Sequence, residues 1–382
     1  MNTKANYIYL ISFLVIIFVF GLFADQALLR NRLTGAPDLS GWSADVGNGF
    51  ENDYIAAMPL KYEALDLNGA FRRLFGQREM NGIVRMDNGY LTASMESMEP
   101  QVIAERAQKV AQLRDELEAR GIAFLFVEPP YKVDPEDPQM PAGEMDFTNR
   151  NIDMFLAELA AQNVPAMDLR AQIRADGLDY YSLFYGSDHH WTVPAGFYGA
   201  RQIMGWLEQA TGKEIPDAVQ DPASYRSEYY EDQFVGTWAL RTGEIFGGRD
   251  DFEILLPEFE TRLKETAEGR EGTFTEILMH TEPLEEKTPK PLTAYAEVLD
   301  DASLSTTNLL AENDMKVMFI SDSFGLATGP YLALGVQDLI WVSSYDPAGV
   351  AAAVEAVQPD AVVLMQYAQL NLIEEKSYNF GY

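Results

Sequence analysis

The chain has 382 residues, of which 47% are hydrophobic and 23% are charged, and its formal net charge is −31. A chain of this size can bury one large core or two moderate ones. The acidic balance argues against a role in binding nucleic acid, because such binding depends on lysine and arginine neutralising phosphates. The sequence has no cysteine, which excludes disulfides, zinc–thiolate sites and a thiolate nucleophile.

The first predicted element is a transmembrane helix over residues 7–24. YIYLISFLVIIFVFGLFA is an uncharged apolar run that is just long enough to span a bilayer. A cleavable signal peptide is the alternative, but the end of this run matches a small-x-small cleavage site poorly. We therefore expect a short tail over residues 1–6, a single-pass anchor over 7–24, and the rest of the chain outside the cytoplasm, in a periplasmic or extracellular position.

Residues 25–95 are expected to form a juxtamembrane segment that leads into the fold. Within it, NGIVRMDNGYL (81–91) places short apolar runs beside two Asn-Gly pairs. Asn-Gly is the preferred dipeptide of tight hairpin turns. The segment therefore predicts a small β hairpin.

Helices and strands alternate over residues 96–382. A helix over 101–121, with Ile103, Ala107, Val110, Leu113 and Leu117 on one face, precedes an apolar strand over 122–128, and a helix over 149–163 precedes a strand over 164–169. Further strands are predicted over 315–321, 337–344 and 359–366, with a helix over 347–358. This recurrence predicts an α/β domain with a parallel sheet. Residues 213–310 show no sustained period, which indicates an insertion, either a lid-like subdomain or long acidic loops.

The first candidate site is the stretch YGSDHHWTVPAGFY (185–198), which holds two of the three histidines. In an extended chain Asp188 and His190 project to one side, where the carboxylate can orient the imidazole, and His189 points the other way. Thr192 then begins a helix over 195–212. A metal site is an alternative, although the only other histidine is His280 and no HExxH spacing exists. A purely structural loop is a third interpretation.

The second candidate site is FISDSFGLATGPY (319–331), where a strand runs into a helix. A serine at such a turn lies at the carboxyl edge of a parallel sheet, the usual place for catalysis in open α/β folds. Neighbouring backbone N–H groups could hold an oxyanion, and Gly325 would leave room for a substrate. The alternative is that Ser321, Asp322 and Ser323 only cap the helix. The two stretches support each other, because the serine needs a base and the Asp-His pair needs a nucleophile.

At these residues the sequence resembles the SGNH-hydrolase-like proteins of the alginate O-acetyltransferase type (AlgJ/AlgX-like), also called DHHW proteins after the tetrad found here at 188–191. The Asp322-Ser323-Phe324 block carries the rest of the likeness, with support from FVEPPYKVDPE (126–136) and FVGTWALRTG (234–243). The resemblance implies a flavodoxin-like three-layer α/β/α fold. It also implies a triad of Ser323 as nucleophile, His190 as base and Asp188 as the orienting acid.

The resemblance further implies an O-acetyltransferase that modifies a secreted or cell-surface polysaccharide, with the acyl group supplied by a multi-spanning membrane acyltransferase and without metal or cofactor. An esterase or deacetylase of the same fold and a non-catalytic export factor are the alternatives. The expected substrate-binding residues are Trp191, Tyr185, Gly325, Tyr367 and Asn371. Gln366, Tyr367 and Asn371, at the end of a strand, are also the candidates for the oxyanion hole. Scattered cations, Lys132, Arg201 and Arg241, are the candidates for contacting an anionic acceptor.

Overall fold

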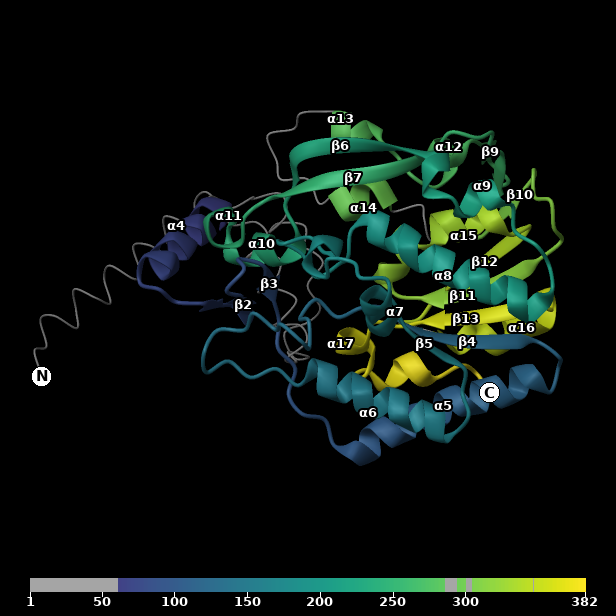
Figure 1. Ribbon diagram of the computed structural model, residues 1–382, viewed down its shortest axis with the longest axis horizontal. Helices are drawn as coiled ribbons and strands as arrows, with labels where there is room; N and C mark the ends of the chain where they lie inside the picture. Colours follow the sequence, from purple (N-terminus) through teal and green to yellow (C-terminus); the bar gives the residue numbers. More distant parts are fainter. Residues whose placement is uncertain (1–60, 286–293, 300–303, 346) are drawn as a thin grey trace, which may run out of the picture.

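The computed structural model describes residues 61–285, 294–299, 304–345 and 347–382 (Figure 1). The predicted anchor at residues 7–24 lies outside these ranges. Among the residues that the structure describes, no helix is both long enough and apolar enough to cross a membrane.

The centre of the molecule is an eight-stranded sheet with the order β5-β4-β13-β11-β12-β10-β8-β9. Its first five strands are parallel, and the last three add to one edge in antiparallel fashion. The strands are β4 (Ala123–Glu128), β5 (Ala166–Asp168), β8 (Leu263–Glu265), β9 (Glu271–Gly272), β10 (Thr306–Asn308), β11 (Lys316–Ser321), β12 (Asp338–Ser343) and β13 (Ala361–Met365). The predicted α/β class with a mostly parallel sheet is confirmed.

The central strands are apolar because both of their faces are covered. Every residue of β13 is buried, and so is β11 from Val317 onward. Such continuous apolar runs are typical of parallel sheets with helices on both sides. The longer helices are α5 (Pro100–Glu118), α6 (Thr148–Ala161), α8 (Val193–Thr211), α15 (Gly329–Gly335) and α16 (Val350–Val357).

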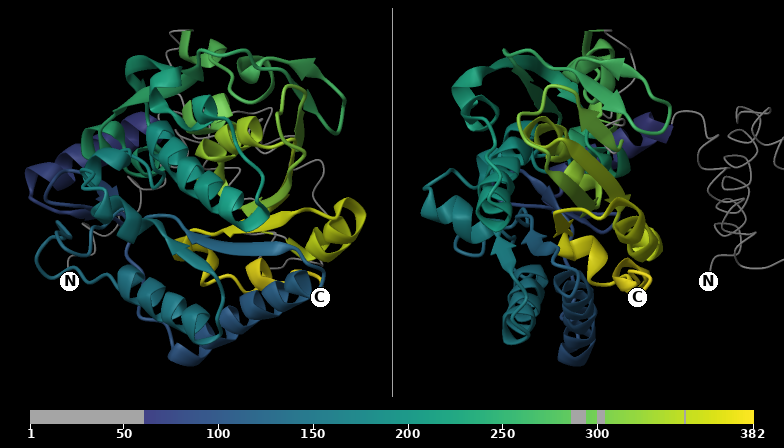
Figure 2. Two further views of the ribbon diagram at one scale, coloured as in Figure 1. Left: turned by 45° about the vertical axis from the view of Figure 1, so that its right-hand side comes forward. Right: turned by 90° about the vertical axis from the view of Figure 1, so that its right-hand side faces the viewer.

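Helix α5 packs on β4 beside α6, and α8 packs on β13 and against α15. Both views of Figure 2 show α5 and α6 side by side at the bottom of the molecule. The apolar face predicted for α5 is confirmed, since all five of its named residues are buried. Helix α8 begins where the Thr192 side chain accepts a hydrogen bond from the Ala195 amide, and it ends at Gly212 in the left-handed conformation.

A smaller unit lies beside the main sheet, next to the histidine-containing stretch, where the Leu91 amide donates to the Gly186 carbonyl (Figure 1). It contains α4 (Lys61–Leu74) and a three-stranded sheet of β1 (Glu79–Met80), β2 (Ile83–Arg85) and β3 (Leu91–Thr92). The predicted hairpin is confirmed, because Asn81 and Gly82 both have positive φ, as a two-residue turn of this type requires. Two short helices, α10 (Thr237–Thr242) and α11 (Glu244–Gly247), pack against this unit.

The described residues between 213 and 310 form more regular structure than their sequence suggests. Strands β6 (Tyr225–Phe234) and β7 (Asp250–Pro257) form an antiparallel ribbon, which runs across the top of Figure 1. Strands β8, β9 and β10 from the same region extend the main sheet. The same region holds the short helices α9 (Asp217–Gln220), α12 (Phe274–Ile277), α13 (Glu282–Glu285) and α14 (Ala294–Leu299), whereas α7 (Leu169–Ala175) precedes it and α17 (Ala368–Asn371) follows β13. This region is therefore partly continuous with the central fold.

Candidate active site

Three polar side chains from two distant parts of the sequence meet at the carboxyl edge of the sheet. The His190 Nδ1 lies 2.7 Å from Asp188 Oδ1, and the His190 Nε2 lies 2.7 Å from Ser323 Oγ. Both distances are within hydrogen-bond range. Asp188 and His190 are buried, with 1% and 7% of their surfaces exposed. The structure thus brings together the three residues that the sequence suggested as nucleophile, base and orienting acid.

Ser323 lies in a turn that we call the serine turn, residues 321–325. Strand β11 ends at Ser321, and Asp322 caps the short 3₁₀ helix Ser323–Ala327 by accepting a hydrogen bond from the Phe324 amide (2.9 Å). The expected capping role therefore belongs to Asp322. The Ser323 hydroxyl does not cap the helix and instead contacts His190.

Asp322 also ties the serine turn to the chain that follows β13. Its Oδ2 accepts hydrogen bonds from the Tyr367 amide and from Asn371 Nδ2, both at 2.6 Å. Burial raises the pKa of Asp322 to about 6, against the effect of these donors. The carboxylate thus holds the end of β11 and the start of α17 together beneath Ser323.

The histidine loop, residues 185–191, is closed at its base by a bridge between Phe184 and Trp191. Inside it, Asp188 Oδ1 accepts a hydrogen bond from the His190 amide (3.0 Å) as well as contacting the ring. This is an Asx turn and not the extended chain that the sequence analysis assumed. Asp188 and His190 meet because the backbone folds around the carboxylate.

The second oxygen of Asp188 is held by a segment far along the chain. Asp188 Oδ2 accepts a hydrogen bond from the Thr237 amide at 2.5 Å. Gly236 permits this approach, because a Cβ at that position would collide with the Asp188 side chain and the Ser187 backbone. The likeness noted in FVGTWALRTG therefore has a physical basis, although the sequence pattern did not reveal the contact.

The environment of His190 favours the neutral imidazole. Burial and the neighbouring His189 lower the pKa of His190 to about 4, against the opposite effect of Asp188. Burial acts to raise the pKa of Asp188, but the two imidazoles outweigh it and hold that pKa well below its ordinary value. The ring of Tyr295, from α14, stacks on His190 with centroids 4.1 Å apart, and its hydroxyl donates to the Ser323 carbonyl (3.0 Å).

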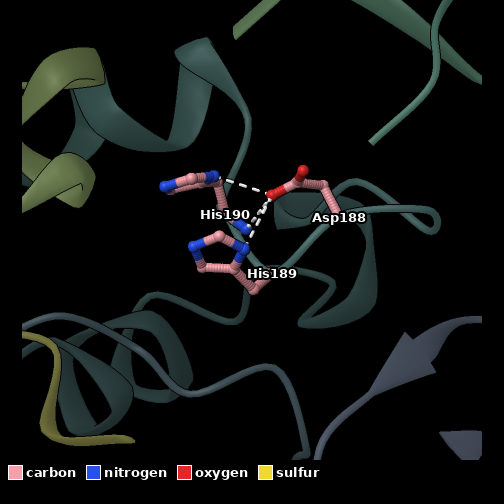
Figure 3. A group of neighbouring side chains, drawn as sticks. All are labelled: Asp188, His189 and His190. Carbon is pink, nitrogen blue, oxygen red and sulfur yellow. Dashed lines mark hydrogen bonds and ion pairs between the residues drawn. The ribbon is translucent and has the colours of Figure 1, made fainter. Parts of the chain in front are cut away.

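His189 does not point away from Asp188, which corrects the expectation from the sequence. Its ring lies against His190 with centroids 3.7 Å apart, and Figure 3 shows both rings beside the Asp188 carboxylate. The His189 Nδ1 comes within 3.1 Å of Asp188 Oδ1 but makes no hydrogen bond there. The cause is the turn at Asp188, which places consecutive side chains on one side.

Among the described residues, the side chains of Asp188, His189 and His190 are also grouped closely enough to hold a metal ion. Their candidate ligand atoms lie within 4.8 Å of one another. However, His190 Nδ1 and Asp188 Oδ1 already bond to each other, and an ion there would replace that bond. The arrangement therefore suits proton transfer to and from His190 Nε2 better than it suits a metal centre.

Four of the residues expected to bind substrate are interior residues. The side chains of Tyr185, Trp191, Tyr367 and Asn371 are at most 2% exposed and so offer no surface to a substrate. Trp191 Nε1 donates to the Phe324 carbonyl (3.0 Å), and Tyr367 stacks on Phe324 with centroids 4.0 Å apart. These residues pack against the serine turn and the histidine loop on the side that faces the protein interior.

Gly325 and Gln366 also differ from expectation. A Cβ at Gly325 would collide with the Ser321 hydroxyl, so this glycine permits close packing within the turn and does not open space for a substrate. Gln366 is buried, and its amide donates to the Ser377 carbonyl (3.0 Å). Both positions are therefore structural.

The expected oxyanion amides are largely occupied. The Phe324 and Gly325 amides donate to the side chain and carbonyl of Asp322. Tyr345, which the sequence analysis did not select, lies just after β12 with its hydroxyl 3.5 Å from Ser323 Oγ and about a third of its surface exposed (37%). Its position at the end of the strand beside β11 is the one signal that could have identified it.

Of the cations proposed for an anionic acceptor, Lys132 is fully buried and Arg241 donates to the Asn81 carbonyl at 3.1 Å. Arg201 lies on α8 with its guanidinium over the Phe197 ring. None of these contacts joins a cation to Ser323. The prediction that Lys132 faces an acceptor is wrong, because the side chain has no exposed surface.

Residues 88–231 match the family model described as the SGNH hydrolase-like domain of the acetyltransferase AlgX. The matched segment includes the histidine loop and ends before the serine turn. No curated protein matches the chain.

Two solved proteins share the fold. PatB1 of Bacillus cereus, in a structure with a sulfonyl adduct, is 17% identical with a TM-score of 0.62, and the match covers 80% of this chain and 99% of that one. A DHHW family protein from Eubacterium siraeum is 15% identical with a TM-score of 0.58, covering 79% of this chain and 95% of that one. The resemblance seen in the sequence is thus confirmed: residues 88–231 are similar to the SGNH hydrolase-like domain of the acetyltransferase AlgX, and the fold is shared with PatB1 and a DHHW family protein.

Proposed function

We propose that this protein is a serine-dependent O-acetyltransferase that modifies hydroxyl groups of a secreted or cell-surface polysaccharide. The observation that carries the proposal is the chain of two 2.7 Å contacts from Asp188 through His190 to Ser323. This is the arrangement by which an imidazole activates a serine hydroxyl. The AlgX family match supports acyl transfer as the reaction class.

The reaction proceeds in two half-reactions. His190 Nε2 takes the proton from Ser323 Oγ as that oxygen attacks the donor's carbonyl carbon, and the same proton then goes to the departing donor group. A sugar hydroxyl next gives its proton to His190 and attacks the acyl-serine. The new ester leaves, and Ser323 regains its proton from His190. A pKa of about 4 keeps His190 neutral, and so able to accept a proton, at ordinary pH.

Tyr345 is the donor that we assign to the developing oxyanion. Its hydroxyl is partly exposed and lies next to Ser323 Oγ, where the carbonyl oxygen of a bound ester would come. Burial raises the pKa of its phenol, which keeps the hydroxyl protonated and able to donate. A donor aimed at this position lowers the barrier because negative charge appears there only during reaction.

The proposal extends to partners and location. An acyl donor delivered by a multi-spanning membrane acyltransferase, an acceptor outside the cytoplasm and an anchor at residues 7–24 together form a consistent arrangement for a membrane-held enzyme. The chemistry uses no metal or cofactor, because the proton transfers and the covalent step are all assigned to Ser323, His190 and Asp188.

The test is a transfer assay with the full chain. The protein is incubated with 4-nitrophenyl acetate and a panel of oligosaccharides, and products are identified by mass spectrometry. We expect acetylated sugar from the wild type and from Ser227→Ala, whose serine is exposed on β6, and none from Ser323→Ala. Release of free acetate alone, with every acceptor, would establish an esterase in place of a transferase. Absence of both products would contradict the catalytic role.

A further inference from the structure

Lys132 is a lysine with no access to solvent, and the proposed reaction does not use it. It follows β4 in the sequence Pro129-Pro130-Tyr131-Lys132, and its exposed surface is 0%. A buried ammonium is costly unless it is paired or hydrogen-bonded. The partners of this side chain therefore indicate what it does.

The ammonium of Lys132 donates to three backbone carbonyls. Two belong to the histidine loop, Tyr185 (2.6 Å) and Asp188, and the third is Leu91 of β3 (3.0 Å). Three acceptors match the three N–H groups of a charged lysine, whereas a neutral amine has only two. Within the described part of the chain, no carboxylate pairs directly with Lys132. The face of the Trp238 ring lies 4.7 Å away and adds a cation–π contact.

Asp250 contacts the hydrogen-bond donors of the same loop, whereas Lys132 contacts its carbonyl acceptors. It begins β7, and its carboxylate accepts hydrogen bonds from the amides of Gly186 (2.7 Å) and Ser187 (2.8 Å) and from the Ser187 hydroxyl. The Ser187 hydroxyl in turn accepts a hydrogen bond from the Gly236 amide (2.9 Å). Asp250 is thereby linked to the segment whose Thr237 amide holds Asp188.

We propose that Lys132 and Asp250 are positioning residues that form a charge clamp on the histidine loop, the cation holding its carbonyls and the anion its amides, so that His190 faces Ser323. The inference rests on the proposed function for its effect on catalysis. A loop of this kind has no sheet or helix pairing of its own between Tyr185 and His190. Backbone amides of Leu91 and Ala239 donate to the Gly186 and Ser187 carbonyls, and the fixed charges from β7 and from the chain after β4 add to this constraint.

The clamp also makes an electrostatic prediction. The positive charge of Lys132 contributes to lowering the pKa of His190. Burial lowers the pKa of Lys132 itself to about 7, while Asp188 and Asp250 oppose that shift. Removing the ammonium should therefore let His190 hold its proton to a higher pH. A role limited to filling space would leave the titration of His190 unchanged.

The test compares Lys132→Met, which keeps the length of the side chain but has no donor, with Lys132→Arg, which keeps the charge. The matched control is Lys316→Met, at a partly exposed lysine that is the first residue of β11, at the other end of the strand from Ser323. We expect Lys132→Met to lower kcat by about 10- to 100-fold with KM little changed, as for a misplaced catalytic group. Lys132→Arg should recover part of the loss, and the control should keep wild-type kcat.

A second readout is independent of turnover. Histidine-labelled NMR spectra should show the His190 titration moving to higher pH in Lys132→Met and staying in place in Lys316→Met. If Lys132→Met does not fold, Asp250→Asn takes its place with a smaller loss of kcat expected, because one carboxylate oxygen becomes a donor facing Ser187. An unchanged His190 titration together with wild-type kcat in the folded variants would overturn the clamp. A wild type without acyl transfer would instead count against the proposed function, and the NMR result would still decide the clamp.

Discussion

The serine turn and the histidine loop meet at one site but are held in place by different means. The serine turn is built from neighbours in sequence, with a buried strand, an Asp cap and a glycine within residues 317–325. The histidine loop depends on contacts from Lys132, Thr237 and Asp250, which lie 49 or more residues away in the chain from the loop residues that they contact. The difference teaches that the turn carrying the nucleophile starts from a local strand-and-cap pattern, which Tyr367 and Asn371 then hold in place, whereas the position of the base depends mainly on contacts from other elements.

The strongest challenge to this comparison is Asp188→Asn. The asparagine side chain has only one accepting oxygen, so it cannot accept hydrogen bonds from both the His190 Nδ1–H and the Thr237 backbone amide. The imidazole therefore loses its orientation. We expect kcat to fall by about 10⁴-fold, as for the equivalent change in other triads. Steady-state kinetics measure the loss, with Asp251→Asn, an exposed neighbour on β7, as the control. A loss below tenfold would mean that Asp188 does not orient the base.

A change outside both regions should come next in size. In Gly236→Ala the added Cβ collides with Asp188 and pushes the Thr237 amide away from the carboxylate. A displacement of this kind can cost about 100-fold in kcat. Gly205→Ala on α8, where a Cβ meets nothing within 4 Å, is the matched control. Wild-type kcat in Gly236→Ala would show that the histidine loop does not need this support.

The serine turn should respond to Asn371→Ala mainly through stability. The change leaves Asp322 Oδ2 with one donor fewer in a buried site, and the expected loss is about 1–3 kcal/mol in the free energy of unfolding. Denaturant titration measures it. We expect kcat to fall less than in Gly236→Ala, because the Phe324 and Tyr367 amides still hold Asp322. A larger kinetic effect than that of Gly236→Ala would reverse the ranking of the two regions.

The smallest perturbation is a change of pH. The chain has three histidines, so histidine-selective NMR can resolve each of them. We expect His190 to titrate near pH 4, with His190→Asn supplying the assignment. Because the unfolded imidazole binds its proton near pH 6.5, the folded state should lose the stability contributed by neutral His190 as pH falls from about 6.5 to 4. A His190 titration at 6.5 or above would contradict the buried, neutral base.

The sequence alone predicts the parts of the fold that depend on local pattern. The period of α5, the apolar runs of β11 and β13 and the Asn81-Gly82 turn all appear as predicted. Strands β8, β9 and β10 were not predicted, because each has only two or three residues and gains its stability from the neighbouring edge of the sheet. A period cannot be read from so few positions.

The site divides in the same way. A possible Asp188–His190 pair is indicated by scarce histidine gathered in one loop, and a serine at the sheet edge is indicated by a strand end, whereas the choice of Ser323 as the partner of His190 follows from the family resemblance. The side toward which His189 points, the burial of Lys132 and the place of Tyr345 do not follow, because they depend on a backbone turn and on elements that meet only after folding. A single sequence shows which residues can react, and the fold decides which of them face one another.

The central claim is that Ser323 forms a covalent acyl intermediate. The most direct measurement is intact-protein mass spectrometry after rapid quenching of the chain with an activated acetyl ester, followed by peptide mapping. The wild type should gain one acetyl group on the peptide that contains Ser323, His190→Asn should gain it far more slowly, and Ser323→Ala should not gain it. An unmodified wild type that still turns over the donor, or an acetyl group on another residue, would contradict the account.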